Sequence, residues 1–123
     1  MKSLSDIKKI ARETIAIELA AVAKLESSIN DDFVNAINLI LSTKGRLIVA
    51  GIGKSANIAN KMVATFNSTG QPAVFLHAAD AIHGDLGNIQ EGDVVICISK
   101  SGNTPEVKAL VPFIKNMGNK IIA

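Results

Sequence analysis

The chain has no tryptophan and no tyrosine, only four phenylalanines, and no run of basic residues. Its 13 basic and 11 acidic residues are scattered along the sequence and give a formal charge of +2. Proteins that bind nucleic acid usually carry a basic patch, and those that bind single strands add aromatic rings on which the bases stack. The composition therefore argues against nucleic acid as a partner.

The sequence also lacks an uninterrupted apolar segment long enough to cross a bilayer, and its N-terminus lacks the apolar core of a signal peptide. Charged residues interrupt the longest helical segment at Lys8, Lys9, Arg12, Glu13, Glu18 and Lys24. We therefore expect a cytoplasmic protein that does not enter the membrane.

Cysteine is nearly absent too. Cys97 is the one cysteine, and it lies inside the apolar run from Val94 to Ile98 with no cysteine or histidine at ligand spacing. A small buried residue fits this position, so we predict a core residue and no metal site. Apolar residues, in contrast, make up 48% of the 123 residues, which is enough for one globular domain with a core.

The N-terminal segment has the period of a long amphipathic helix. From Ser5 to Ile29, apolar residues recur every three or four positions, at Ile7, Ala11, Ile15, Leu19, Val22, Leu25 and Ile29. Ile10 and Ile17 lie off this stripe and widen it beyond what one core contact needs. The extra width suits either a contact with another subunit or a helix held between two layers. Asn30 and the acids after it predict the start of a second helix that ends near Lys44.

Beyond residue 44 the pattern changes to short runs that are apolar at every position. These runs cover residues 47–50, 73–76, 94–98 and 121–123, and they alternate with helical stretches at 55–68 and 105–117. Continuous apolar runs indicate strands that are covered on both faces, which is typical of a parallel sheet between helices. The predicted fold is α/β: a doubly wound, three-layer parallel sheet with helices on both faces and an N-terminal helical extension.

The last apolar run also ends the sequence. In a doubly wound sheet, a strand normally leads into a functional loop and a covering helix. We therefore expect a single domain over residues 1–123 that is incomplete at its C-terminus, with N-terminal helices over 1–44 and an α/β core over 45–123.

The segment GIGKSANIANK, residues 51–61, follows the first predicted strand and raises three interpretations. A Walker loop needs a glycine five residues before its Gly-Lys pair, but Ile48 occupies that position inside the strand. A dinucleotide fingerprint needs an acid at the end of the next strand, and the first acid after that strand is Asp80. The Walker loop is therefore excluded, and the dinucleotide site stays a minor alternative.

The third interpretation of this segment is a turn that holds a small phosphorylated ligand. Gly51 and Gly53 would bring backbone amides and the Ser55 hydroxyl to the positive end of a helix, where Lys54 adds a full charge. The plainer alternative is that the glycines make a tight turn and Ser55 caps the helix.

A second loop of similar chemistry follows the strand at 94–98. Its sequence is Ser99-Lys100-Ser101-Gly102-Asn103-Thr104, followed by a proline suited to the first helical turn. The three hydroxyls of Ser99, Ser101 and Thr104 can converge on one tetrahedral anion. The plainer alternative is a helix capped by Thr104. Two such loops at the carboxyl ends of strands in one sheet lie where open α/β folds bind ligands.

These loops, together with Ser68-Thr69-Gly70 and the run His77-Ala78-Ala79-Asp80-Ala81-Ile82-His83-Gly84-Asp85-Leu86-Gly87, resemble the sugar isomerase (SIS) domain. Within that family the chain is most similar to the D-arabinose 5-phosphate isomerases. These enzymes make the precursor of Kdo, the eight-carbon sugar acid of lipopolysaccharide and some capsules. The resemblance is strong from about Leu47 onward and looser over the N-terminal helices.

The resemblance implies a role for each matching position. Ser99, Ser101 and Thr104 would hold the sugar phosphate with Ser55 close by, and Lys54, His83 and Glu106 match the catalytic or substrate-binding positions. Gly51, Gly53 and Gly102 would shape the loops. The family implies a homotetramer with sites shared between subunits, and a reaction without a metal or redox cofactor.

The sequence departs from the family pattern at three points. Lys100 stands where a neutral amide is more usual, and Asn103 stands where an acid is common, so the second loop is more positive than is typical. Members of the family also carry a further glutamate and histidine beyond the position of Ala123, and usually a pair of CBS domains. We therefore expect the 123 residues alone to bind weakly and not to turn over substrate.

Isomerisation of ribulose 5-phosphate to arabinose 5-phosphate needs a base and a group that stabilises an enediolate. Glu106 is the candidate base, although it would lie about 6 Å from the phosphate and be repelled by roughly 2–3 kcal/mol at an effective dielectric constant of about 20. Lys54 or Lys100 could compensate this charge. His83 could exchange protons near neutral pH or simply order its loop. His77 is interpreted as a structural residue.

The sequence leaves two main functions open. One is the isomerase, and the other is a non-catalytic domain that senses a sugar phosphate through the same loops.

Overall fold

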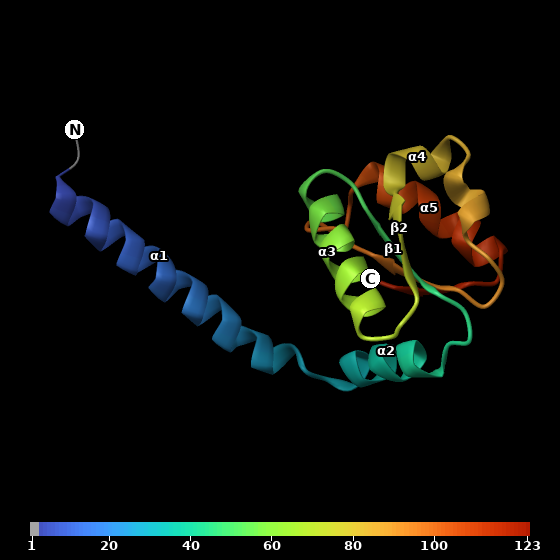
Figure 1. Cartoon of the computed structure of the whole chain (residues 1–123), viewed down its shortest axis with the longest axis horizontal. Helices are drawn as coiled ribbons and strands as arrows, with labels where there is room; N and C mark the ends of the chain where they lie inside the picture. Colours follow the sequence, from blue (N-terminus) through green and yellow to red (C-terminus); the bar gives the residue numbers. More distant parts are fainter. Residues whose placement is uncertain (1–2) are drawn as a thin grey trace. The chain divides into compact units, whose positions relative to one another are not determined.

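The computed structural model, drawn in Figure 1, describes residues 3–123. These residues divide into two compact units between Ile37 and Asn38. The division lies inside α2 (Asp31–Ser42). The predicted boundary at residue 44 stays a prediction. No helix within residues 3–123 combines the length and the apolar character needed to cross a membrane.

The first unit contains α1 (Leu4–Lys24), the 3-10 helix η1 (Leu25–Ser28) and the start of α2. A capping box begins α1: the Asp6 N–H donates to Ser3 Oγ at 3.2 Å, and the Ser3 N–H donates to Asp6 Oδ2 at 3.0 Å. The Phe33 N–H donates to Asn30 Oδ1 at 3.1 Å, as the predicted cap requires. No residue of α1 is buried, so nothing in the described part of this unit, residues 3–37, covers the wide apolar stripe of the helix.

The second unit is built on a sheet of four parallel strands in the order β2-β1-β3-β4. Their bounds are β1 (Leu47–Gly51), β2 (Ala73–His77), β3 (Val94–Cys97) and β4 (Lys120–Ile122). Every residue of β1 and β3 is buried, which confirms that these runs are covered on both faces. The parallel α/β fold predicted from the sequence is therefore confirmed.

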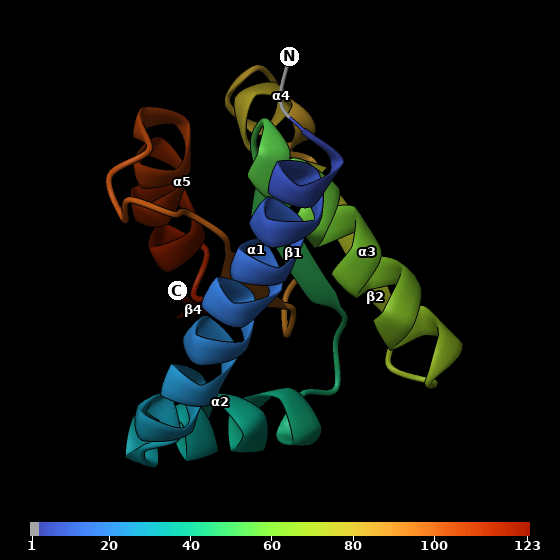
Figure 2. The ribbon, with the colours of Figure 1, turned by 90° about the vertical axis from the view of Figure 1, so that its left-hand side faces the viewer.

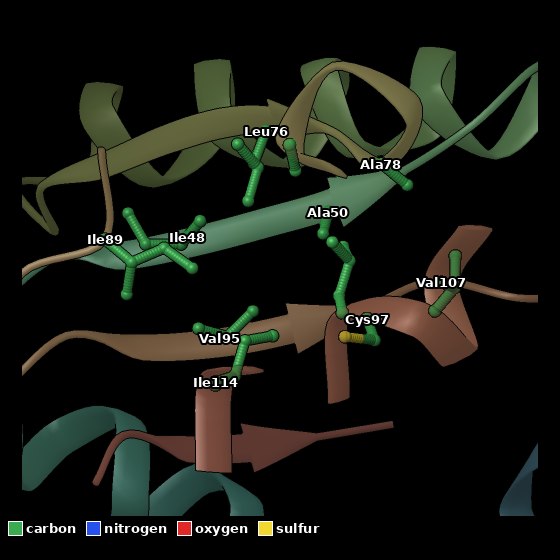
Figure 3. Packing of buried hydrophobic residues seen from close by; sticks show 11 residues of the cluster. Ile48, Ala50, Leu76, Ala78, Ile89, Val95, Cys97, Val107 and Ile114 are labelled. Atoms are coloured by element: carbon green, nitrogen blue, oxygen red, sulfur yellow. The ribbon is translucent and has the colours of Figure 1, made fainter. Parts of the chain in front are cut away.

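Helices cover the two faces of this sheet, and Figure 2 shows α3 and α5 on opposite sides of β1. α3 (Lys54–Ser68) packs on one face through Ala59, which belongs to the same core cluster as Leu47 and Val49. The other face is covered by α4 (Ala78–Ile82), the 3-10 helix η2 (Asp85–Asn88) and α5 (Pro105–Asn116). Figure 3 shows this second core, in which Val107 and Ile114 of α5 meet side chains of the strands.

The two short helices α4 and η2 were not predicted from the sequence. Five residues are too few to establish a helix period, and Gly84 with its φ of 138° interrupts the segment between them. Ala78 and Ala81 nevertheless bury one face of α4 in the core. This short helix fixes the start of the segment that carries His83.

An ion pair connects the residues that precede β1 and β3. The Asp93 side chain, in a residue only 3% exposed, accepts from the Arg46 guanidinium at 2.7 Å, from the Arg46 N–H at 2.8 Å and from the Gln90 N–H at 2.9 Å. Burial raises the pKa of the Asp93 carboxyl, but the hydrogen bonds from Arg46 and Gln90 outweigh burial and hold this pKa below its usual value. This end of the sheet is therefore a structural anchor.

Candidate active site

The candidate site lies at the point where the strand order of the sheet reverses. From β1 the chain moves to β2 on one side, and it then crosses to β3 on the other side. The Ile98 N–H donates to the Ala50 carbonyl at 2.9 Å, so the chain beyond β3 stays hydrogen-bonded to β1. The loops that follow β1 and β3 therefore leave the sheet side by side, at the crevice where open α/β sheets bind ligands.

The loop between β1 and α3 is shaped by two glycines. Gly53 is the N-cap of α3 and has a φ of 59°, a conformation that favours glycine. A Cβ atom on Gly51 would approach the Ser55 backbone to 3.0 Å, so glycine allows the first turn of α3 to lie close to the strand end. Lys54 is the first residue of α3 and is exposed, and Ser55, the second, is partly buried.

The first turn of α3 has no side-chain cap. Ser55 therefore does not cap this helix, which removes the plainer interpretation of its hydroxyl. Backbone N–H groups at a helix start need an acceptor from a side chain, from water or from a ligand, and the helix dipole makes an anion favourable there. The exposed Lys54 next to these groups adds a positive charge.

Each of the three hydroxyls in the loop between β3 and α5 takes part in a hydrogen bond within the loop. Ser99 Oγ and Thr104 Oγ1 are 2.8 Å apart and share a hydrogen bond. The Asn103 N–H donates to Ser101 Oγ at 3.1 Å. Gly102, with a φ of 66°, makes the turn that permits these contacts. Within residues 3–123 the Ser101 hydroxyl donates to no acceptor, so its proton is available to a ligand while its oxygen accepts from Asn103.

Thr104 is the N-cap of α5 by position, but its hydroxyl makes no capping hydrogen bond. It bonds to Ser99 instead. Pro105 follows as the first residue of the helix, and Glu106, which is half-buried, is the second. Within residues 3–123, Glu106 takes part in no salt bridge. Compensation of its charge by Lys54 or Lys100 stays a prediction.

His83 follows α4 as its C-cap, and its N–H donates to the Asp80 carbonyl at 2.9 Å. The residue is exposed. His77, at the end of β2, has its Nδ1 3.5 Å from Asp80 Oδ2 and packs its ring edge-on against Phe75 at 6.3 Å between centroids. His77 therefore has neighbours on its own strand and on α4, but its buried Nδ1 has no hydrogen-bond partner within residues 3–123, and its structural role stays a prediction.

Cys97 is 7% exposed at the end of β3, and burial raises the pKa of its thiol. A buried neutral thiol packs as a small apolar side chain, which confirms the prediction of a core residue. Within residues 3–123, no three His, Cys, Asp or Glu side chains gather closely enough to share a metal ion.

The structure thus brings the predicted phosphate-binding hydroxyls of Ser99 and Thr104 into contact. Lys54, His83 and Glu106 belong to three separate segments, at the start of α3, the end of α4 and the start of α5. α4 and α5 pack on the same face of the sheet. The catalytic roles of the three residues stay predictions.

A sequence profile of the SIS domain matches residues 40–123, which include both loops and all the strands. The chain belongs to the SIS domain family. A protein of Haemophilus influenzae named "Probable arabinose 5-phosphate isomerase" is 51% identical over 115 residues, which is 94% of this chain and 34% of that protein. Arabinose 5-phosphate isomerase KdsD of Pseudomonas aeruginosa is 47% identical over 113 residues, or 92% of this chain and 35% of that protein.

A protein of known structure has nearly the same fold as this chain. The structure of Escherichia coli CFT073 c3406 in complex with arabinose 5-phosphate superposes with a TM-score of 0.92 at 41% identity, over 98% of this chain and 64% of that one. The resemblance to arabinose 5-phosphate isomerases predicted from the loops is therefore confirmed. The SIS chain drawn in Figure 1 spans about a third of the length of the curated relatives it matches.

Proposed function

We propose that the full-length protein containing this domain interconverts D-ribulose 5-phosphate and D-arabinose 5-phosphate. The observation that carries the proposal is the pair of neighbouring loops after β1 and β3, which present hydroxyls and uncapped helix starts at the reversal of strand order. The similarity to proteins named arabinose 5-phosphate isomerase supports the choice of substrate.

The phosphate group of the sugar binds to the loop between β3 and α5. Ser99, Ser101 and Thr104 supply the hydroxyls, and Ser55 approaches from the neighbouring loop. Hydrogen bonds to a charged group contribute about 1.5–3 kcal/mol each, so a few of them give useful affinity. Binding the phosphate in this way leaves the aldehyde or ketone end of the sugar free to react.

The reaction moves one proton between C1 and C2. Starting from the ketose, a base removes a proton from C1, the electron pair forms the C1–C2 double bond, and the C2 carbonyl oxygen becomes an oxyanion. The O1 proton then moves to O2 as the C1 carbonyl forms, the electron pair of the double bond takes a proton at C2, and the product is the aldose. Two groups are needed at the sugar: a base of suitable pKa, and a donor or cation that stabilises the oxyanion.

Three residues are proposed for these tasks. Lys54 stabilises the developing oxyanion or the phosphate, because its ammonium is exposed beside the loop. Glu106 acts as the base and His83 assists ring opening of the cyclic aldose. A charged Glu106 in the first turn of α5 is repelled by the phosphate, so it must point along the sugar or lie near a cation.

The experiment that tests the proposal is exchange of the sugar's C1 and C2 protons with deuterium oxide, followed by NMR with the full-length protein. We expect exchange with arabinose 5-phosphate, and a loss of about 100-fold or more in rate for Lys54→Ala, because such electrostatic groups contribute about that factor. Lys61→Ala, on the exposed side of the same helix, is the matched control and should retain the rate.

The alternative function is a non-catalytic domain that senses a sugar phosphate through the same loops. It predicts binding of arabinose 5-phosphate without any proton exchange, and that result would refute the isomerase. A homotetramer, a place in Kdo synthesis and a cytoplasmic location belong to the isomerase proposal. Light scattering of the full-length protein tests the first of these.

A further inference from the structure

Lys108 contacts the loop between β3 and α5 from one turn inside α5. Its Nζ donates to Asn103 Oδ1 at 2.8 Å. Side chains on a helix lean toward its N-terminus, so a lysine at the fourth helical position reaches back past the helix start to this loop. The mechanism above gives Lys108 no role.

Lys108 lies near the end of α5 at which the helix dipole disfavours a cation. The start of a helix carries a partial positive charge, so cations are favoured at the opposite end, where Lys115 lies in the last turn of α5. Within residues 3–123, no carboxylate forms a salt bridge with Lys108. A phosphate bound at this loop would supply a direct anionic partner for the Lys108 ammonium, which Glu106 of the first turn does not pair with.

Asn103 connects Lys108 to the hydroxyls of the loop. Its side-chain oxygen accepts from Lys108, and its backbone N–H donates to Ser101 Oγ at 3.1 Å. Gly102 between them holds the left-handed turn. The chain of contacts therefore fixes Ser101 with its hydroxyl proton free. Because Asn103 is neutral, the charge of Lys108 stays uncancelled, whereas an aspartate there would neutralise it.

We propose that Lys108 is a positioning residue for the phosphate group: through Asn103 it holds Ser101 in the binding orientation, and its charge raises the affinity of the loop for a phosphate dianion. The inference rests on the proposed function, since it takes the loop after β3 as the place where the sugar phosphate binds. It acts on binding and not on the proton transfer at C1 and C2.

The test measures the full-length protein in two ways: calorimetric titration with inorganic phosphate, and steady-state kinetics with arabinose 5-phosphate. Lys108→Met should raise the Kd for phosphate and the KM about five- to tenfold, as loss of one hydrogen bond of ordinary strength implies, with kcat within about twofold. Lys108→Arg should restore both constants, because it keeps a charged donor.

Two further variants distinguish the effect of the hydrogen bond between Lys108 and Asn103 from the effect of the Lys108 charge. Asn103→Asp keeps an acceptor for Lys108 but cancels its charge, so it should weaken phosphate binding while leaving the melting temperature unchanged. Lys115→Met removes one positive charge from the far end of the same helix and should leave the Kd and KM at wild-type values.

The inference is overturned if Lys108→Met and Lys115→Met change the Kd equally, if Lys108→Met lowers kcat at constant KM, or if the wild type does not bind phosphate. A wild type that binds phosphate, responds to Lys108→Met as expected and shows no turnover would overturn the isomerase but support the role of Lys108. The calorimetric titration therefore distinguishes the two failures.

Discussion

The hydrogen bond between Ser99 and Thr104 makes the contributions of their hydroxyls to phosphate affinity non-additive. Because Oγ and Oγ1 are 2.8 Å apart, one hydroxyl donates its proton to the other, and the pair keeps one proton for a phosphate. In Ser99→Ala the Thr104 hydroxyl loses its partner and can donate to the phosphate directly. In Thr104→Val, Ser99 can do the same. Each single substitution should therefore leave the Kd for phosphate nearly unchanged.

The double variant Ser99→Ala/Thr104→Val loses the proton that the pair supplies. A hydrogen bond to a charged group contributes about 1.5–3 kcal/mol, so the Kd should rise about 10- to 100-fold. Ser101→Ala is the comparison. Its oxygen already accepts from the Asn103 N–H and its proton is free, so this single substitution should weaken binding as much as the double variant does.

Calorimetric titration of the full-length variants with inorganic phosphate measures these constants, and the melting temperature confirms that each variant is folded. Thr104→Val removes no helix cap, because the Thr104 hydroxyl makes no capping hydrogen bond. If each single substitution raised the Kd tenfold or more and the two effects added in the double variant, both hydroxyls would donate to the phosphate. The prediction that the Ser99–Thr104 pair supplies only one proton to the phosphate would then be wrong.

Three further predictions concern the glycines and the base of the sheet. Gly102→Ala, at a φ of 66°, should raise the Kd for phosphate. Gly118→Ala, at a φ of 80° beyond α5, should lower only the melting temperature. Equal changes of the Kd in the two variants would contradict this expectation. Gly45→Ala drives its Cβ into a backbone carbonyl and should lower the unfolding free energy by more than about 1 kcal/mol in urea titration, so an unchanged midpoint would refute the clash. Arg46→Met leaves the buried Asp93 carboxylate without its guanidinium partner, although two backbone N–H groups still donate to it, and should cost about 3 kcal/mol at pH 7. Because the folded pKa of Asp93 is depressed, its stabilisation is present above its unfolded pKa of about 3.9 and is lost as pH falls through the folded pKa, so the wild-type and variant stabilities should converge below about pH 4. Parallel stability curves would count against this account.

The central strands could be predicted from the sequence because strands that are buried on both faces consist of consecutive apolar residues. β1 lies between β2 and β3 and has helices over both faces, so each of its five positions is buried and none can be polar. β3 shows the same pattern. At the sheet edge the apolar pattern is weaker. Lys120, the first residue of β4, is exposed, and the predicted strand began only at residue 121.

The segment from Ala78 to Asn88 was harder to predict, because its order comes from contacts that are distant in sequence. α4 has five residues, too short for a repeated apolar face, and it is held by packing of Ala81 against the core that α5 also joins. The motif identified His83 as a candidate, but its place at the end of a helix on the α5 side of the sheet follows from that packing. Tertiary contacts here override a local sequence signal that is nearly absent.

For the loop between β3 and α5, residue types determine which side chains can donate hydrogen bonds, whereas the folded conformation determines which of their protons are free. The sequence identified Ser99, Ser101 and Thr104 as possible donors, and this part needs only the chemistry of their side chains. Which protons remain free depends on the turn at Gly102, which brings Thr104 back to Ser99 and the Asn103 N–H to Ser101. A count of hydroxyls therefore gives three donors for a phosphate, whereas the folded loop offers two before any rearrangement. Affinity in this loop follows the number of free protons, and only the folded chain fixes that number.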